Sequence, residues 1–135
     1  LFASTMSLPH EAAAALTLLG LVPKGQWGSR ISDLVWLSKK SKSNKAIVGI
    51  IRASASEEKA AEMLRDFYTE NLFNPMLSAL KVDNQEIRSV MLSSLMVGYT
   101  FNYEILNLFE HLGVSDKKSK ALFAKTVQTI LTAEL

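Results

Sequence analysis

The stretch from Met91 to Gly113, MLSSLMVGYTFNYEILNLFEHLG, is apolar around nearly its whole circumference, yet the acidic residue Glu104 lies in its middle. A membrane span needs about 20 mostly apolar residues, and a charge at its centre costs at least about 2.5 kcal/mol. Further polar residues interrupt the run: Ser93, Ser94, Thr100, Asn102 and Asn107. We therefore expect a helix packed against protein on more than one side, and no membrane association.

On a helical wheel of residues 84–109, the polar side chains form one narrow stripe of Ser89, Ser93, Thr100, Glu104 and Asn107. An amphipathic surface helix needs an apolar stripe of about 100°. Here the apolar arc covers roughly twice that width at 3.6 residues per turn. A helix with this pattern is expected to have two buried edges.

The rest of the chain also carries helical periodicity, with almost no strand alternation. Pro9 and Gly20 bracket one helix. The next predicted helix has an apolar face of Trp27, Ile31, Leu34 and Val35. Further helices are expected over 44–54, over 56–80 with Ser56 as N-cap, over 84–109, and after the N-cap Ser115. Because a proline breaks helix hydrogen bonding, Pro75 predicts a kink near residues 71–75. The fold class is thus all-α, with six to seven helices in one domain, 1–135.

The composition argues against catalysis. The 135 residues include no cysteine and two histidines, and no phosphate-binding glycine loop or catalytic motif occurs. Neither His10 nor His111 has a partner at the spacing of a triad, so we expect no catalytic residue, no metal and no cofactor. The net charge of +2 is too small to indicate nucleic-acid binding. Lys39, Lys40 and Lys42 are interpreted as a solvated helix C-terminus rather than a phosphate site.

Aromatic, methionine and amide side chains suggest a binding pocket instead, because small-molecule pockets are mostly apolar with a few polar groups. The candidates are Trp36, Met63, Phe67, Tyr68, Met91, Leu95, Tyr99, Asn102 and Tyr103. Trp36 lies opposite the apolar face of its own helix, which predicts a second contact surface. The alternative is that these residues simply fill the core.

Several motifs resemble one branch of the TetR/AcrR family of transcriptional regulators, in its C-terminal regulatory domain. They are Ile50-Ile51-Arg52-Ala53-Ser54, Leu64-Arg65-Asp66-Phe67, Pro75, Val97-Gly98 and Val127-Gln128-Thr129-Ile130-Leu131. The similarity spans nearly the whole chain. The start, LFASTMSLP, resembles the linker helix that follows the family's helix-turn-helix, so residues 1–7 are expected to end that helix. If the resemblance holds along the whole chain, the DNA-binding domain itself is expected to be missing from this sequence.

The resemblance implies a cytoplasmic homodimer that binds a small apolar effector and controls DNA binding through the missing domain. It implies that the last two helices pair with their twins in a four-helix interface. The expected interface residues are Val90, Val97, Phe101, Leu108, Phe123, Val127, Ile130 and Leu131. The alternative function is a helical protein–protein adaptor with no ligand cavity.

The two edges of the 84–109 helix are then interpreted separately. Leu95, Tyr99, Asn102 and Tyr103 form the expected pocket edge, and Val90, Val97, Phe101 and Leu108 form the expected edge toward the last helix and the twin. The wheel alone allows the reverse assignment. Gly98 would let a neighbouring backbone approach closely.

Overall fold

The computed structural model describes residues 15–16 and 18–135. The predicted linker helix at 1–7, the start of the helix at Pro9, and His10 lie outside the described residues. The α-helices are α2 (Trp27–Ser38), α3 (Lys42–Ser54), α4 (Glu58–Asp66), α5 (Asn74–Leu80), α6 (Gln85–Thr100), α7 (Leu108–His111) and α8 (Asp116–Thr132). Short 3-10 turns occupy Leu19–Leu21 (η2) and Lys24–Gln26 (η3), and π-helical segments occupy Phe67–Phe73 (η4) and Phe101–Ile105 (η5). No strand occurs over these residues, which confirms the all-α prediction.

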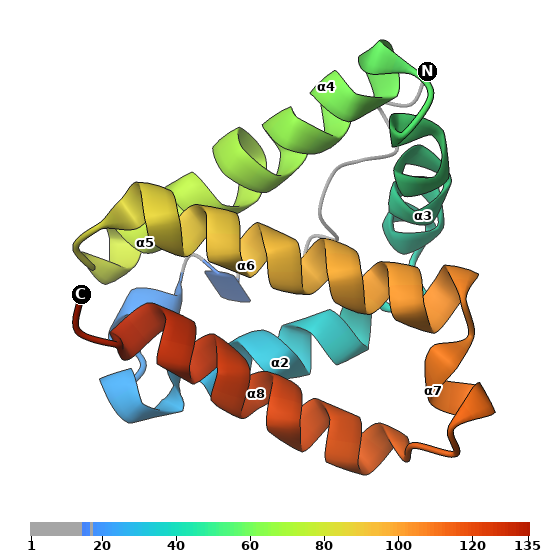
Figure 1. Ribbon diagram of the computed structural model, residues 1–135. Coiled ribbons are helices and arrows are strands. Elements are labelled where there is room, and N and C mark those ends of the chain that lie inside the picture. Colours follow the sequence, from blue (N-terminus) through green and yellow to red (C-terminus); the bar gives the residue numbers. More distant parts are fainter. Residues whose placement is uncertain (1–14, 17) are drawn as a thin grey trace.

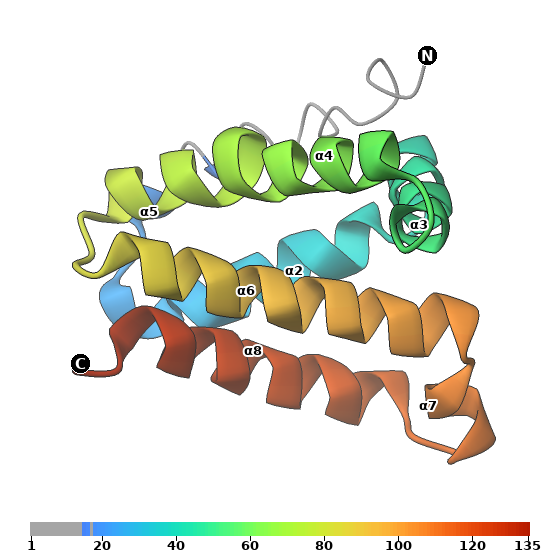
Figure 2. The same ribbon diagram turned by 45° about the horizontal axis from the view of Figure 1, so that its top comes forward.

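The helices form a layered bundle (Figures 1 and 2). α6 lies between the α4–α5 rod and α8, and α2 packs along α8. α3 closes one end of the bundle against α4. None of the helices in the described part of the chain is long and apolar enough to cross a membrane.

α2 and α8 make the most extensive contact between two helices in the described part of the fold. Gly28 has no side chain, which lets the α2 backbone approach the α8 backbone at Ala124. Gln128 of α8 accepts a 2.7 Å hydrogen bond from the Gly28 amide and donates one of 2.9 Å to the Lys24 carbonyl. Further along, the Ser32 hydroxyl donates to the Lys120 carbonyl at 3.1 Å. These bonds set the register of the two helices.

The rod from α4 to α5 is continuous but changes its hydrogen-bonding pattern at η4. A π turn holds more residues than an α turn, so the sequence spacing of the inward-facing positions changes across this segment. Ala60, Leu64, Phe67 and Tyr68 are buried before the shift, and Phe73, Met76, Leu77 and Leu80 after it. At the place where a kink is predicted, near residues 71–75, the structure has a π segment followed by Pro75 in the first turn of α5, and the rod continues through it.

The predicted single helix over 84–109 is wrong in its last part. α6 continues through η5 only to Ile105, and Asn107 then adopts a left-handed backbone with φ 50°. Asparagine tolerates that conformation better than most residues, so the chain turns here and α7 starts afresh at Leu108.

The polar stripe of α6 lies on its inner side. Ser89 and Thr100 are buried, whereas the opposite side of the helix exposes large apolar residues. Those residues are Ile87, Val90, Met91 and Phe101. The helix is therefore covered by its own chain on one side and leaves an apolar surface on the other.

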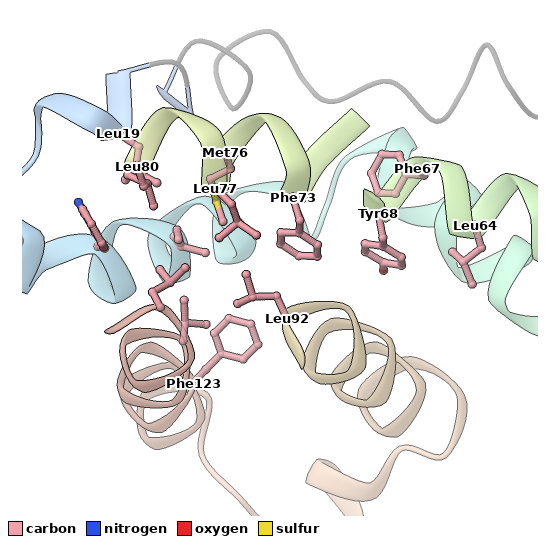
Figure 3. Close-up of a cluster of buried hydrophobic side chains, with 14 of the residues drawn as sticks. Leu19, Leu64, Phe67, Tyr68, Phe73, Met76, Leu77, Leu80, Leu92 and Phe123 are labelled. Carbon is pink, nitrogen blue, oxygen red and sulfur yellow. The ribbon is translucent and has the colours of Figure 1, made fainter. Parts of the chain in front are cut away.

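One core joins all the layers (Figure 3). Figure 3 shows Phe73 and Leu77 from the α4–α5 rod facing Leu92 of α6 and Phe123 of α8. Leu77 and Leu92 are almost completely buried. Burying a large aliphatic side chain contributes about 1.5 to 3 kcal/mol, so this central contact is a major source of stability.

The helix caps are partly as predicted. Ser115 caps α8, because its hydroxyl accepts a hydrogen bond from the Lys118 amide at 3.2 Å. Ser56 does not cap α4. Its hydroxyl instead donates to the Ala53 carbonyl in the preceding turn, and α4 begins at Glu58 after Glu57.

Candidate functional site

A mostly apolar cavity lies between α2, α3, the η4–α5 segment and α6. Its free interior volume is about 90 Å³. The apolar walls include Ile31 and Leu34 of α2, Ile47 of α3 and Met96 of α6. A space of this character suits a small apolar group, and a cavity of about 150 Å³ binds benzene, so a ring of that size would require lining side chains to move here.

The aromatic wall of the cavity is produced by η4. Phe67, Tyr68, Leu72 and Phe73 all line it. The rings of Tyr68 and Phe73 stack with centroids 5.9 Å apart, and Phe67 meets Tyr68 edge to face at 5.2 Å. Figure 3 shows these three rings along the same rod. Burial in this wall raises the pKa of the Tyr68 hydroxyl above its ordinary range.

The corner between α2 and α3 supplies a polar part of the lining. Ser38, Ser41, Ser43 and Asn44 all border the cavity here. Ser41 caps α3 by accepting from the Asn44 amide at 3.1 Å, and its hydroxyl donates to the Ser38 carbonyl at 2.7 Å. The Asn44 side chain donates to the Lys39 carbonyl at 3.0 Å. Because side chains hold the corner, its geometry is set before any ligand arrives.

Next to this corner, the ammonium of Lys39 lies in a cage of aromatic rings. Its Nζ is 4.0 Å from the ring centroid of Trp36, 3.9 Å from that of Tyr103 and 4.9 Å from that of Tyr99. It also donates to the Tyr99 hydroxyl and lies 3.4 Å from an Asp116 carboxylate oxygen. Such cation–π contacts contribute about 0.5 to 2 kcal/mol, depending on desolvation. The interpretation of Lys39 as solvated is therefore wrong, whereas Lys40 and Lys42 are exposed.

The cage links three helices. Trp36 of α2 donates a 2.9 Å hydrogen bond from its indole to Asp116, the first residue of α8. Its ring also contacts Tyr99 of α6 and Phe123 of α8. This is the second contact surface predicted for Trp36.

Burial shifts the pKa values of the ionisable side chains in the cage. Desolvation lowers the pKa of Lys39 below its ordinary value, and the negative charge of Asp116 opposes that shift. Desolvation also raises the pKa of Tyr99, and that of Tyr103, with Asp116 and Glu104 adding to both effects. The phenols therefore remain neutral hydrogen-bonding groups at neutral pH.

The predicted ligand-binding residues separate into three groups. Phe67 and Tyr68 line the cavity, and Trp36, Tyr99 and Tyr103 form the cage. Met63 and Leu95 pack at the edge of the core, Asn102 is half-buried, and Met91 is 47% exposed on the outer side of α6. None of these last four lines the cavity.

The predicted interface residues also divide. Val90, Phe101 and Leu108 are exposed, and Val97 lies half-buried beside a shallow groove between α4 and α6. Phe123, Val127 and Leu131 are buried in the core of the chain itself, and Ile130 packs against that core. Those four side chains point inward because they fill the α2–α8 and α6–α8 contacts. The large apolar side chain that α8 exposes is instead Leu122, at 67%.

Several lining residues were not singled out from the sequence. Ile31, Leu34 and Val35 were assigned to the apolar face of their helix, and the cavity lies within that face. Met96 and Thr100 line it in place of Leu95 and Tyr99, one position away around α6. The run of Ser38, Ser41, Ser43 and Asn44 beside an apolar helix face was the signal that could have located the polar corner.

Comparison with known proteins identifies a family. The family model described as "Tetracyclin repressor-like, C-terminal domain" matches residues 26–131. That range includes α2 to α8 almost completely, and with it the cage and all of the cavity lining except Leu16. No curated protein and no solved structure matches the chain significantly.

Proposed function

Since the chain belongs to the tetracyclin repressor-like C-terminal domain family, we propose that it is the effector-binding and dimerisation domain of a transcriptional repressor. The observation that carries the proposal is the mostly apolar cavity that is lined by four helical segments and partly open to solvent. DNA recognition would belong to a separate helix-turn-helix domain of the same regulator. A repressor of this kind works in the cytoplasm, where its operator is.

α6 is the element through which a ligand would act. Its inner side contributes Met96 and Thr100 to the cavity, while its outer side exposes Met91 and Phe101. A ligand that displaces α6 therefore moves both surfaces at once. It changes the repressor only if it binds one arrangement better than the other, since equal affinity shifts nothing.

The proposed dimer surface is the outer side of α6 together with α8, which lie side by side (Figures 1 and 2). Exposed apolar side chains on it include Ile87, Met91, Phe101 and Leu122. Gly98 adds an open position, because a Cβ built there would meet no atom within 4 Å. Apolar surface of this kind is characteristic of interfaces between protein chains.

A matched pair of α2 variants tests ligand binding. Leu34 lines the cavity, whereas Leu37 is 66% exposed on the same helix. A library of small apolar and aromatic compounds is screened by thermal shift, and hits are measured by calorimetry. Binding stabilises the fold by RT ln(1 + [L]/Kd), so hits should raise the melting temperature of the natural chain and of Leu37→Phe. Leu34→Phe, which fills the cavity, should lose the response.

The result that would overturn the proposal is a chain that responds to no compound, or whose response is the same in Leu34→Phe. That outcome would favour the alternative, a helical adaptor that docks another protein on its exposed apolar surface. Calorimetry in the presence of one binder also checks the site, because a second binder of the same cavity must compete with it.

A further inference from the structure

Two side chains at the cavity carry hydroxyls that have no partner among the described residues. Tyr68 of η4 is 4% exposed and Thr100 of α6 is 7% exposed, so both are more than nine-tenths buried. Neither hydroxyl makes a hydrogen bond within the described part of the chain. Buried polar groups nearly always have such a partner, because leaving one unpaired is costly. Two unpaired hydroxyls at one cavity therefore indicate a partner that the chain itself does not supply.

The hydroxyl of Thr100 differs from those of the other threonines in the described helical segments. A helical threonine commonly donates to the carbonyl four residues earlier. The other four do so, at 2.7 to 3.1 Å: Thr69, Thr126, Thr129 and Thr132. Thr100 makes no such bond to Met96, although α6 continues through it into η5. Its hydroxyl is therefore free to bind a group outside its own helix.

The cavity is the space that these two side chains share. Tyr68 also borders the groove between α4 and α6, and Thr100 also borders a smaller space beside Lys39. Both line the cavity, which they reach from different helical segments. A carbonyl oxygen held there has two lone pairs and can accept a hydrogen bond from each hydroxyl.

The other polar side chains of the lining are already engaged. Ser38, Ser41 and the Asn44 amide donate to backbone carbonyls of the α2–α3 corner or of the helix before it, and Ser43 has a partner too. No charged side chain of the described residues lines the cavity. A charged ligand would thus lose its hydration without meeting an opposite charge, which is strongly unfavourable.

Resting on the proposed function, we infer that the cavity selects an uncharged ligand: a small, mostly apolar molecule whose oxygen acceptor is held by the hydroxyls of Tyr68 and Thr100. Its apolar body lies against Phe67, Phe73 and Met76. Because one hydroxyl comes from η4 and the other from α6, the bound oxygen links the α4–α5 rod to α6. The hydrogen bonds of the ligand, as well as its volume, then determine the position of α6.

Three compounds with the same ring test the need for an uncharged acceptor: cyclopentanone, methylenecyclopentane and cyclopentylamine. The second replaces the ketone oxygen with a methylene group, and the third is a cation at pH 7. NMR titration of the full chain at pH 7 measures the Kd of each. The amine should bind about tenfold more weakly than cyclopentanone, or weaker still, because no carboxylate of the described lining can pair with it.

Two hydroxyl deletions assign the hydrogen bonds. Thr100→Val keeps the branched shape, and Tyr68→Phe keeps the ring. Each should weaken cyclopentanone about three- to tenfold, the contribution of one neutral hydrogen bond, without weakening methylenecyclopentane. Thr126→Val is the control, because its hydroxyl donates to the Leu122 carbonyl of α8 and the residue does not line the cavity. It should bind all three compounds as the natural chain does.

The outcomes separate this inference from the proposed function. If either deletion binds cyclopentanone as tightly as the natural chain, or if the amine binds as tightly as the ketone, the inference is overturned while a ligand cavity stands. If no compound binds at millimolar concentration, the inference fails; the library screen of apolar and aromatic compounds then decides the proposed function. Both deletions should fold, since neither hydroxyl has a partner to lose, and thermal unfolding checks this. If one does not fold, the other and the amine still decide.

Discussion

The backbone of Gly28 lies directly against that of Ala124, and a Cβ added at Gly28 would be 2.2 Å from the Ala124 carbonyl oxygen. No side chain can move to relieve such a contact, so α2 and α8 would have to separate. Overpacking of this kind costs about 1 to 3 kcal/mol. Gly28→Ala should lower the free energy of unfolding by that amount, measured by urea denaturation.

Gly49 is the control for this substitution. It lies inside α3, is exposed, and a methyl group added there would have no atom within 4 Å. Alanine favours helix over glycine by about 0.5 to 1 kcal/mol, so Gly49→Ala should stabilise the fold. If both substitutions changed stability in the same direction, the close approach of α2 to α8 would not be its cause.

The buried guanidinium of Arg88 ties α6 to the end of α8. It donates to the Ile130 carbonyl at 2.8 Å, to the Ala133 carbonyl at 2.7 Å and to the Asp83 carbonyl and carboxylate at 2.8 Å. Arg88→Met keeps most of the volume but leaves these carbonyls unpaired. Unfolding by urea should show a loss of about 1 to 3 kcal/mol.

Asp83 provides an independent readout of the same contact. The hydrogen bond from Arg88 holds the pKa of Asp83 below its ordinary value. A lowered folded pKa stabilises the fold above the ordinary carboxyl pKa, and this contribution is lost as the pH falls through the folded value. In Arg88→Met, NMR titration should show the Asp83 pKa returning toward its ordinary range. An unchanged value would contradict the pairing.

The Ser89 hydroxyl is buried and lacks a hydrogen-bond partner among the described residues. Burying an unpaired hydroxyl costs about 1 to 3 kcal/mol by mutational measurements, and alanine is also the better helix former. Ser89→Ala should therefore stabilise the chain by about 1 kcal/mol in thermal or urea unfolding. Ser94→Ala is the control, since Ser94 is exposed and its hydroxyl donates to the Val90 carbonyl; its effect should be smaller.

All three tyrosines of the chain, Tyr68, Tyr99 and Tyr103, have raised pKa values because burial disfavours the phenolate. A raised folded pKa stabilises the fold below the unfolded value near pH 10, and this stability is lost as the pH rises further. Lys39, with its lowered pKa, has the opposite effect. Tyrosine absorbance in the near ultraviolet should show Tyr68 and Tyr99 ionising only as the chain unfolds. Ordinary titration of all three near pH 10 in folded protein would contradict this burial.

The proposed dimer surface is tested by charge. Met91→Glu places a carboxylate on the exposed apolar side of α6 and should shift a dimer toward monomer in sedimentation, because a buried unpaired charge is costly. Leu37→Glu introduces the same charge on exposed α2, away from this surface, and should leave the assembly unchanged. A monomeric natural chain at micromolar concentration would remove the dimer proposal itself.

The sequence predicted local features of the helices well where a single residue type determines them. Ser115 caps α8 through its hydroxyl, and Pro75 marks the place where the α4–α5 rod changes its hydrogen bonding. The helix break at Asn107 could not be predicted in this way, because its left-handed backbone interrupts a stretch whose side chains continue the apolar pattern. A wheel drawn through that point places Leu108 on a helix to which it does not belong.

Periodicity also could not distinguish the core from the surface on α6. Ile87 and Met91 are exposed, whereas Ser89 and Thr100 are buried, because the tertiary position of the helix overrides the polarity of its sides. Similarly, the sequence predicted Trp36, Tyr99 and Tyr103 together as candidate ligand-binding residues. Only the fold shows that they surround the ammonium of Lys39.

The π segment Phe67–Phe73 holds more residues than the same length of α-helix would. Deleting one exposed residue there, such as Glu70, would allow an ordinary α turn, and Phe73 and Met76 would keep nearly the same direction around the helix axis. The same deletion within the regular helix α4 would instead rotate everything downstream by about 100°, and Phe73 and Met76 would leave the cavity wall although neither had been substituted. The rod should therefore tolerate the loss of one residue at the π segment better than the loss of one residue in α4.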